Sequence, residues 1–211
     1  AIGPTDLAVF HRIALHSDLQ TVELMYRRYW VCFSPRFSGT IFAGGRYTRL
    51  SEQFAFNSRA ELGTFAYDVD AENDIVGLQM GADMWWCITQ GVRMGHEGKA
   101  GIYNNRFKLD TVAAEQDLAG APNVLVNESD NGNNVAFIGE YSLDLVVDVL
   151  PSWSIRTGYE ALFINSVALA SDNFNTASPF GLFGQPQRVP FASEQSNVFY
   201  HGWRIGAEYI W

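Results

Sequence analysis

Apolar and polar residues alternate along seven long segments of this chain, and helical periodicity is almost absent. Alternation with a period of two is the pattern of β-strands. The segments are Asp18–Trp30, Ser38–Arg49, Asp74–Ile88, Val92–Tyr103, Val135–Val149, Trp153–Val167 and Val198–Trp211. Each is at least as long as the roughly 9–11 residues with which a tilted strand crosses a bilayer, so the pattern predicts transmembrane strands.

The connections between these segments differ in length. Three are short, at Cys32–Arg36, Thr89–Gly91 and Leu150–Ser152, and three long polar stretches are expected to be outer loops, at about residues 50–73, 109–134 and 168–197. Short turns at one rim and long loops at the other are typical of outer-membrane barrels. We therefore expect an all-β, antiparallel up-and-down barrel forming a single domain over residues 1–211, with residues 1–17 as a loop or an extra strand.

One parity of the strands is apolar and carries no Asp, Glu or Lys; it includes Leu78, Ile102 and Val167. Aromatic residues make up 14% of the chain, and many lie near strand ends on this face. Such placement predicts an interfacial aromatic girdle on a lipid-facing surface. The girdle residues are Tyr26, Trp30, Trp86, Trp153, Trp203, Tyr209 and Trp211. Four basic residues interrupt the apolar face: Arg28, Arg49, His96 and His201.

The opposite parity carries the charges. Its polar members, which we expect to line the lumen, are Glu23, Arg27, Arg46, Gln79, Asp83, Arg93, Glu97, Lys99, Glu140, Asp144, Asp148, Arg156, Glu160, Arg204 and Glu208. Many have a glycine two residues away on the same face, as Gly158 lies between Arg156 and Glu160. Alternating small and large residues accommodate long side chains inside a narrow barrel, so we place this face inward.

Charges at similar depth on neighbouring strands are expected to form ion pairs. The predicted pairs are Glu23 with Arg46, Lys99 with Glu140, Asp144 with Arg156, and Glu160 with Arg204. In a small barrel such pairs would fill the interior, and the protein would be a structural or anchoring element that does not conduct. In a wider barrel they would line an aqueous path with a slight anionic excess, and we favour this porin-like passive pore.

Composition excludes several other functions. The formal net charge is −9 and no long basic run exists, which argues against nucleic acid as a partner. No nucleophile with an adjacent base, metal-ligand spacing or cofactor motif is present, so we expect no enzyme activity, no cofactor and no catalytic or metal-binding residues. A soluble calycin-like small-molecule carrier, with the apolar face turned inward, is the rival class; the strand length and girdle placement argue against it.

Several segments resemble a known family. They are Gly77–Trp86, Gly95–Asn105, Ala136–Glu140, Trp153–Leu162 and Phe199–Trp211, and they resemble the planctomycete family of outer-membrane β-barrel porins over about residues 19–211. The resemblance implies a pore-forming barrel in the bacterial outer membrane, surrounded by its lipid, without catalytic residues. The alternating C-terminal strand that ends on Trp211 looks like a recognition signal for the barrel assembly machinery, and the long loops are candidates for contacts with surface proteins.

The number of predicted strands is odd, whereas single-chain bacterial barrels have an even number. Members of the resembling family carry further strands upstream. We therefore expect this chain to form the C-terminal part of a larger barrel.

Overall fold

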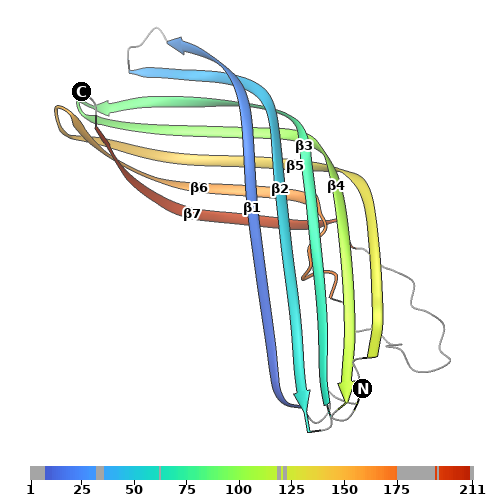
Figure 1. Ribbon diagram of the computed structural model, residues 1–211. Helices are drawn as coiled ribbons and strands as arrows, with labels where there is room; N and C mark the ends of the chain where they lie inside the picture. The colour runs from blue at the N-terminus through green and yellow to red at the C-terminus, as the bar shows by residue number, and fades with distance from the viewer. Residues whose placement is uncertain are drawn as a thin grey trace.

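The computed structural model describes residues 8–31, 36–61, 63–117, 120, 123–174, 193 and 195–209. Seven strands are present in these ranges: β1 (Ala8–Val31), β2 (Phe37–Ala60), β3 (Gly63–Thr89), β4 (Val92–Asp117), β5 (Asn123–Leu150), β6 (Trp153–Val167) and β7 (Ser196–Tyr209). Each strand pairs antiparallel with the next, in the order β1 to β7, and together they form a curled half-barrel (Figure 1). The predicted all-β, up-and-down architecture is confirmed. Within these residues, no helix has the length and apolar character needed to cross a membrane.

The first five strands are much longer than predicted. The stretches 50–73 and 109–134, expected to be loops, belong largely to β2, β3, β4 and β5. Their pairing stays antiparallel, with one register shift between Ala113 and Ala114 of β4. The loop prediction is wrong there because these stretches alternate too, but with the polar side chains outward, which makes them resemble solvated loops. Figure 1 shows β1–β5 continuing well beyond the ends of β6 and β7.

The polarity of the two faces inverts along β3. Between Thr64 and Glu72 the outward positions are polar apart from Ala66, while the inward Phe65 and Tyr67 are buried. From Val76 to Ile88 the outward positions are apolar and exposed. At roughly 3.3 Å per residue and a tilt of about 45°, this apolar run matches the roughly 25 Å apolar band of outer-membrane barrels. We call the apolar outward zone, which on β3 runs from Val76 to Ile88, the belt. The extensions are the parts of β1–β5 that continue past the belt on the side away from the short turns.

The change in polarity falls at one level of the sheet. Arg49 pairs in register with Asp74, and Asp74 with Arg106, so the row of polar outward residues at the edge of the belt crosses β2, β3 and β4. On this row Arg49 Nη2 lies 3.1 Å from a carboxylate oxygen of Glu72. Arg49, one of the basic residues that interrupt the predicted lipid face, therefore lies where a headgroup region would begin.

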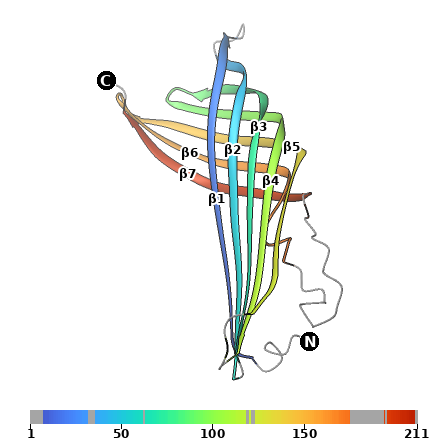
Figure 2. The ribbon, with the colours of Figure 1, turned by 45° about the vertical axis from the view of Figure 1, so that its right-hand side comes forward.

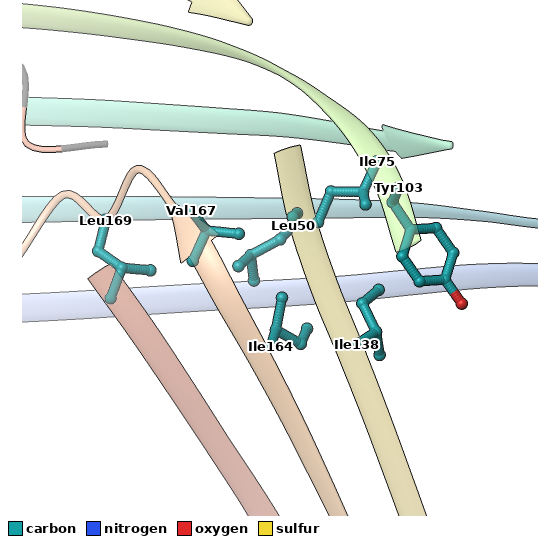
Figure 3. Close-up of a cluster of buried hydrophobic side chains, with 8 residues drawn as sticks. Leu50, Ile75, Tyr103, Ile138, Ile164, Val167 and Leu169 are labelled. Carbon is teal, nitrogen blue, oxygen red and sulfur yellow. The ribbon is translucent and has the colours of Figure 1, made fainter. Parts of the chain in front are cut away.

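Two apolar clusters fill the concave side. The lower cluster lies in the extensions and contains Phe65, Tyr67, Val69, Ala71, Leu109, Ala113, Val126 and Ala170. The upper cluster contains Leu50, Ile75, Tyr103, Ala136, Ile138, Ile164, Val167 and Leu169 (Figure 3). Leu19 of β1 and Val198 of β7 pack against the upper cluster, so every strand contributes to it.

The end of β6 departs from the predicted pattern. Val167 was expected on the outward face, but it is fully buried in the upper cluster. A register shift lies between Asn165 and Val167, and Ser166 takes a left-handed backbone conformation with φ of 61°. The irregularity turns the chain inward after β6, and alternation alone does not reveal it.

A side-chain hydrogen bond links the two edge strands. Ser17 Oγ of β1 and Tyr200 Oη of β7 are 3.0 Å apart, and in both views the two strands cross (Figures 1 and 2). Alternate strands of an antiparallel sheet run in the same direction, so β1 and β7 are parallel in sense and no backbone pairing joins them within the described ranges. Closure with antiparallel pairing alone requires an odd number of further strands between them.

Candidate functional site

The charged residues predicted for the lumen lie on the concave face of the sheet. Several of them reach across the curve rather than to the next strand: Arg46 of β2 contacts Glu140 of β5, and Lys99 of β4 contacts Glu23 of β1. Contacts that pass over two intervening strands are possible only on the inner side of a strongly curved sheet. The structure therefore brings the two ends of the charged face together.

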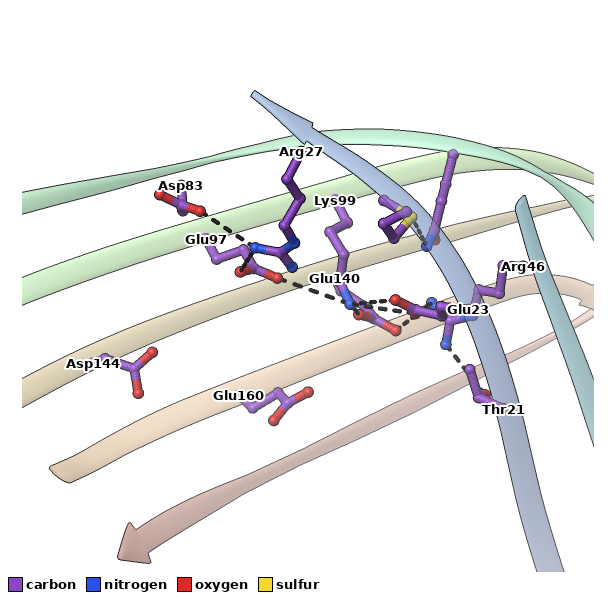
Figure 4. A network of polar contacts seen from close by, with 12 residues as sticks. Thr21, Glu23, Arg27, Arg46, Asp83, Glu97, Lys99, Glu140, Asp144 and Glu160 are labelled. Atoms are coloured by element: carbon purple, nitrogen blue, oxygen red, sulfur yellow. Dashed lines mark hydrogen bonds and ion pairs between the residues drawn. The ribbon is translucent and has the colours of Figure 1, made fainter. Parts of the chain in front are cut away.

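Arg46 forms the centre of this network (Figure 4). Its side chain is 3% exposed, and it contacts Glu140 and lies 3.3 Å from a carboxylate oxygen of Glu23. Lys99 Nζ lies 2.5 Å from Glu140 and 3.3 Å from Glu23, which closes a ring of two cations and two anions. Arg46 Nε also donates a hydrogen bond to Thr48 Oγ1. We call Glu23, Arg46, Lys99 and Glu140 the central cluster.

A second cluster surrounds Asp144. This buried carboxylate accepts hydrogen bonds from Arg156 and Arg204, at 3.2 Å and 2.6 Å between the closest atoms. Arg204 also lies 3.3 Å from Glu160, and Arg156 lies 3.3 Å from Glu208. The side chains of Glu160 and Glu208 are about half exposed. We call Asp144, Arg156, Glu160, Arg204 and Glu208 the β6–β7 cluster.

The remaining predicted lumen residues lie around these two clusters. Arg27 extends over the ring of Phe42 and lies 3.5 Å from Asp83 and 3.8 Å from Glu97. The Arg93 and Asp148 side chains pair at 3.1 Å near the short-turn rim. Gln79 accepts a hydrogen bond of 2.8 Å from the Tyr103 hydroxyl.

All four ion pairs predicted from the register are present: Glu23–Arg46, Lys99–Glu140, Asp144–Arg156 and Glu160–Arg204. The contacts Arg46–Glu140, Lys99–Glu23, Arg27–Glu97 and Arg204–Asp144 were not predicted. All four join strands that are not neighbours, so they depend on the curl of the sheet. Arg204 of β7 reaches Asp144 of β5 across Gly158 of β6, with which both residues pair in register.

The predicted girdle residues lie as follows. The rings of Trp153 and Tyr209 pack at a tilt, with 5.1 Å between their centroids, and Trp86 stacks with Phe37; all lie close to the short-turn rim. Tyr26 and Trp203 are highly exposed on the outward face, while Trp30 is half-buried. Trp211 lies outside the described residues. The rings at the short-turn rim form a layer at one end of the belt, which is where interfacial aromatics are expected.

The two histidines on the predicted lipid face have partners. His96 Nδ1 lies 2.7 Å from the hydroxyl of Tyr141, and His201 Nδ1 lies 2.7 Å from that of Tyr159. Each tyrosine lies on the neighbouring strand. A hydrogen-bonded imidazole is far less costly in an apolar environment than an unpaired one, so these histidines are compatible with the belt.

The described part of the chain contains no group of three or more His, Cys, Asp or Glu residues arranged to hold a metal ion. The charged residues of the concave face are instead paired with one another. Between the two clusters lies a cavity of about 170 Å³, lined by Asp83, Trp85, Glu97, Lys99, Glu140, Asp144, Arg156, Glu160 and Arg204 among others. Its walls are polar and carry both signs of charge.

Comparison with known proteins gave one family. A family model described as "Putative beta barrel porin-7 (BBP7)" matches residues 10–211. No curated protein and no solved structure matches the chain. The match covers β1 from Phe10 onward, all of β2–β7, and both charged clusters.

Proposed function

Because the chain belongs to the BBP7 family of β-barrel porins, we propose that it forms an outer-membrane pore through which small hydrophilic solutes pass along a charged lumen. The observation that carries this proposal is the division of the seven strands into two faces. The outward face is an apolar belt, and the inward face bears paired charges from every strand. Such a division is expected where lipid lies outside a barrel and water inside it.

The charge distribution supports a weak preference for cations. The inward set holds eight carboxylates against six cationic side chains. The buried members neutralise one another, as Arg46 does with Glu140, whereas Glu160 and Glu208 remain about half exposed. Exposed carboxylates on a narrow path attract cations and repel anions.

A second function is favoured by a specific observation. The upper apolar cluster joins residues from all seven strands across the concave side, which is the packing expected of a filled interior. On this alternative the protein is a non-conducting structural or anchoring barrel, and the central cluster is its polar core.

The family assignment also bears on location and partners. A porin family implies transport rather than catalysis and residence in the outer membrane. We propose that the belt contacts membrane lipid, that the C-terminal strand is recognised by the barrel assembly machinery, and that the extensions of β1–β5 offer a surface to other proteins.

Reversal potentials in planar bilayers test the pore. We expect discrete conductance steps with a cation preference that decreases when Glu160→Gln and Glu208→Gln are combined. Glu61→Gln, which neutralises an exposed carboxylate at the turn after β2, is the matched control and should leave the preference unchanged. A correctly folded barrel that never conducts would favour the anchoring alternative.

A further inference from the structure

The chain does not leave the barrel at the end of β6 but enters it. After the left-handed Ser166, residues Val167, Ala168, Leu169 and Ala170 are all buried, and Phe174 packs against aromatic rings of the lower cluster. Phe174 lies 4.9 Å from both Phe54 and Tyr67, measured between ring centroids. We call Ser166–Phe174 the infolded segment.

Two asparagines hold the start of this segment. Asn73 of β3 and Asn105 of β4 are fully buried on the concave face. Asn73 Nδ2 donates to the carbonyl of Ala168 at 2.7 Å, and the Ala168 amide donates back to Asn73 Oδ1 at 2.8 Å. Asn105 Nδ2 donates to the carbonyl of Ser166 at 3.2 Å and to Asn73 Oδ1 at 3.1 Å. The two amides thus replace backbone pairing that the segment loses by leaving the sheet.

A third anchor lies further along the segment. Glu52 of β2, itself largely buried, accepts hydrogen bonds from both the amide and the hydroxyl of Ser171. Most polar side chains that are buried in an apolar interior have at least one hydrogen-bond partner. Asn73, Asn105 and Glu52 each have such partners on the infolded segment, so holding the segment explains their presence inside the barrel.

The infolded segment occupies the level at which the lumen is apolar. Leu169 and Val167 complete the upper cluster together with Leu50, Ile75 and Ile138, as Figure 3 shows. This cluster lies where the inner face changes from the charged residues of the belt to the apolar residues of the extensions. A narrow apolar zone in a water path blocks ions, because ions cannot shed their hydration there and the zone dewets.

We propose that the infolded segment is a built-in stopper of the lumen and that Asn73 and Asn105 are the positioning residues that hold it in place. This inference deepens the proposed pore function and rests on it for the conduction readout alone. The segment narrows the path at the upper cluster and so limits the conductance of the parent protein. Loss of its anchors widens the path by releasing Leu169 and Val167 from between the strands.

The experiment uses full-length protein in which Cys32→Ser and Cys87→Ser remove the natural thiols and Leu169→Cys introduces a reporter. Labelling by a water-soluble maleimide is followed with and without Asn73→Ala and Asn105→Ala. Asn104→Ala, which removes an exposed outward asparagine beside Asn105, is the matched control. Glu52→Gln provides a second release variant if the double asparagine variant does not fold, and heat-modifiable gel migration reports folding.

We expect the reporter to be labelled at least about tenfold faster in the release variants than in the parent or the Asn104→Ala protein, and single-channel conductance to increase in the same variants. Unchanged labelling in folded release variants would overturn the positioning role. Faster labelling without a change in the conductance of a conducting parent would overturn the stopper alone. Faster labelling with no conductance in any variant would overturn the stopper and the proposed pore together.

Discussion

Arg46 of β2 and Glu140 of β5 form an ion pair although β3 and β4 lie between their strands. The pair is nearly inaccessible to solvent, and together with Lys99–Glu23 it links the two halves of the curled sheet. The curvature of the sheet and the burial of these charges therefore depend on one another.

Replacing Arg46 with Met should destabilise the protein by about 3–5 kcal/mol, because the partly buried Glu23 and Glu140 would be left with only Lys99 to neutralise them. Urea titration of the barrel in detergent, followed by its heat-modifiable gel migration, measures the change. Arg49→Met removes an exposed arginine of the same strand and should have a much smaller effect. Equal effects of the two substitutions would contradict the assignment of Arg46 to a buried network.

A cation placed on the belt should impair insertion into lipid. Met80 is 69% exposed near the middle of the apolar run of β3, so Met80→Lys should cost about 2–4 kcal/mol of folding free energy in phospholipid vesicles. Thr64→Lys, on the outward face of the extension of the same strand, should fold like the parent. Tolerance of lysine at both positions would show that the belt does not face lipid.

Side-chain space beside Asp144 depends on a glycine. A Cβ atom at Gly158 would lie 2.4 Å from the Asp144 carboxylate and 2.7 Å from the carbonyl oxygen of Leu143, whereas one at Gly202 of the neighbouring strand would meet nothing within 4 Å. Gly158→Ala should therefore cost about 1–3 kcal/mol by displacing Asp144 from its arginines, and Gly202→Ala should cost less. The midpoints of urea unfolding compare the two variants.

Two carboxylates of the extensions should respond to pH in opposite senses. The hydrogen bonds from Lys108 and Ser129 lower the pKa of Asp110, so its contribution to stability is present at neutral pH and is lost as pH falls through the folded-state pKa. Burial and the nearby Asp70 raise the pKa of Asp68, so its ionised form opposes folding at neutral pH and this penalty disappears in acid.

Replacing each carboxylate by its neutral amide makes this pH dependence of stability measurable. At neutral pH, Asp110→Asn should lower the urea midpoint and Asp68→Asn should raise it. At acidic pH, where both carboxylates are protonated in the parent, the two differences should vanish. A pH-independent effect of either substitution would mean that packing, not charge, causes it.

The sequence predicts the parts of the fold that depend on alternation. The parity of Leu78 and Ile102 on the outward face, and the four neighbouring-strand ion pairs such as Glu160–Arg204, follow from a period of two and an antiparallel register. The contact between Arg46 and Glu140 does not follow, because it depends on curvature, which the pattern of one strand does not encode.

The extensions and the infolded segment were missed for different reasons. In the extension of β3 the alternation is intact but inverted, with Tyr67 inward and Asp68 outward, so acidic residues that look like a loop are one face of a strand. The inversion itself is a readable signal for the edge of the belt. The turn at Ser166 left no such signal, because the positive φ of this non-glycine residue is held by a tertiary hydrogen bond that Asn105 donates to its carbonyl.

Substituted-cysteine accessibility tests the central claim most directly, namely that the charged face meets water and the apolar belt meets lipid. In a Cys32→Ser, Cys87→Ser protein inserted in vesicles, Glu160→Cys and Leu78→Cys report the two faces. We expect rapid reaction of the thiol at position 160 with a charged, membrane-impermeant reagent, and reaction of the thiol at position 78 only with a lipid-soluble one. The reverse pattern would contradict the account and place the apolar face inside.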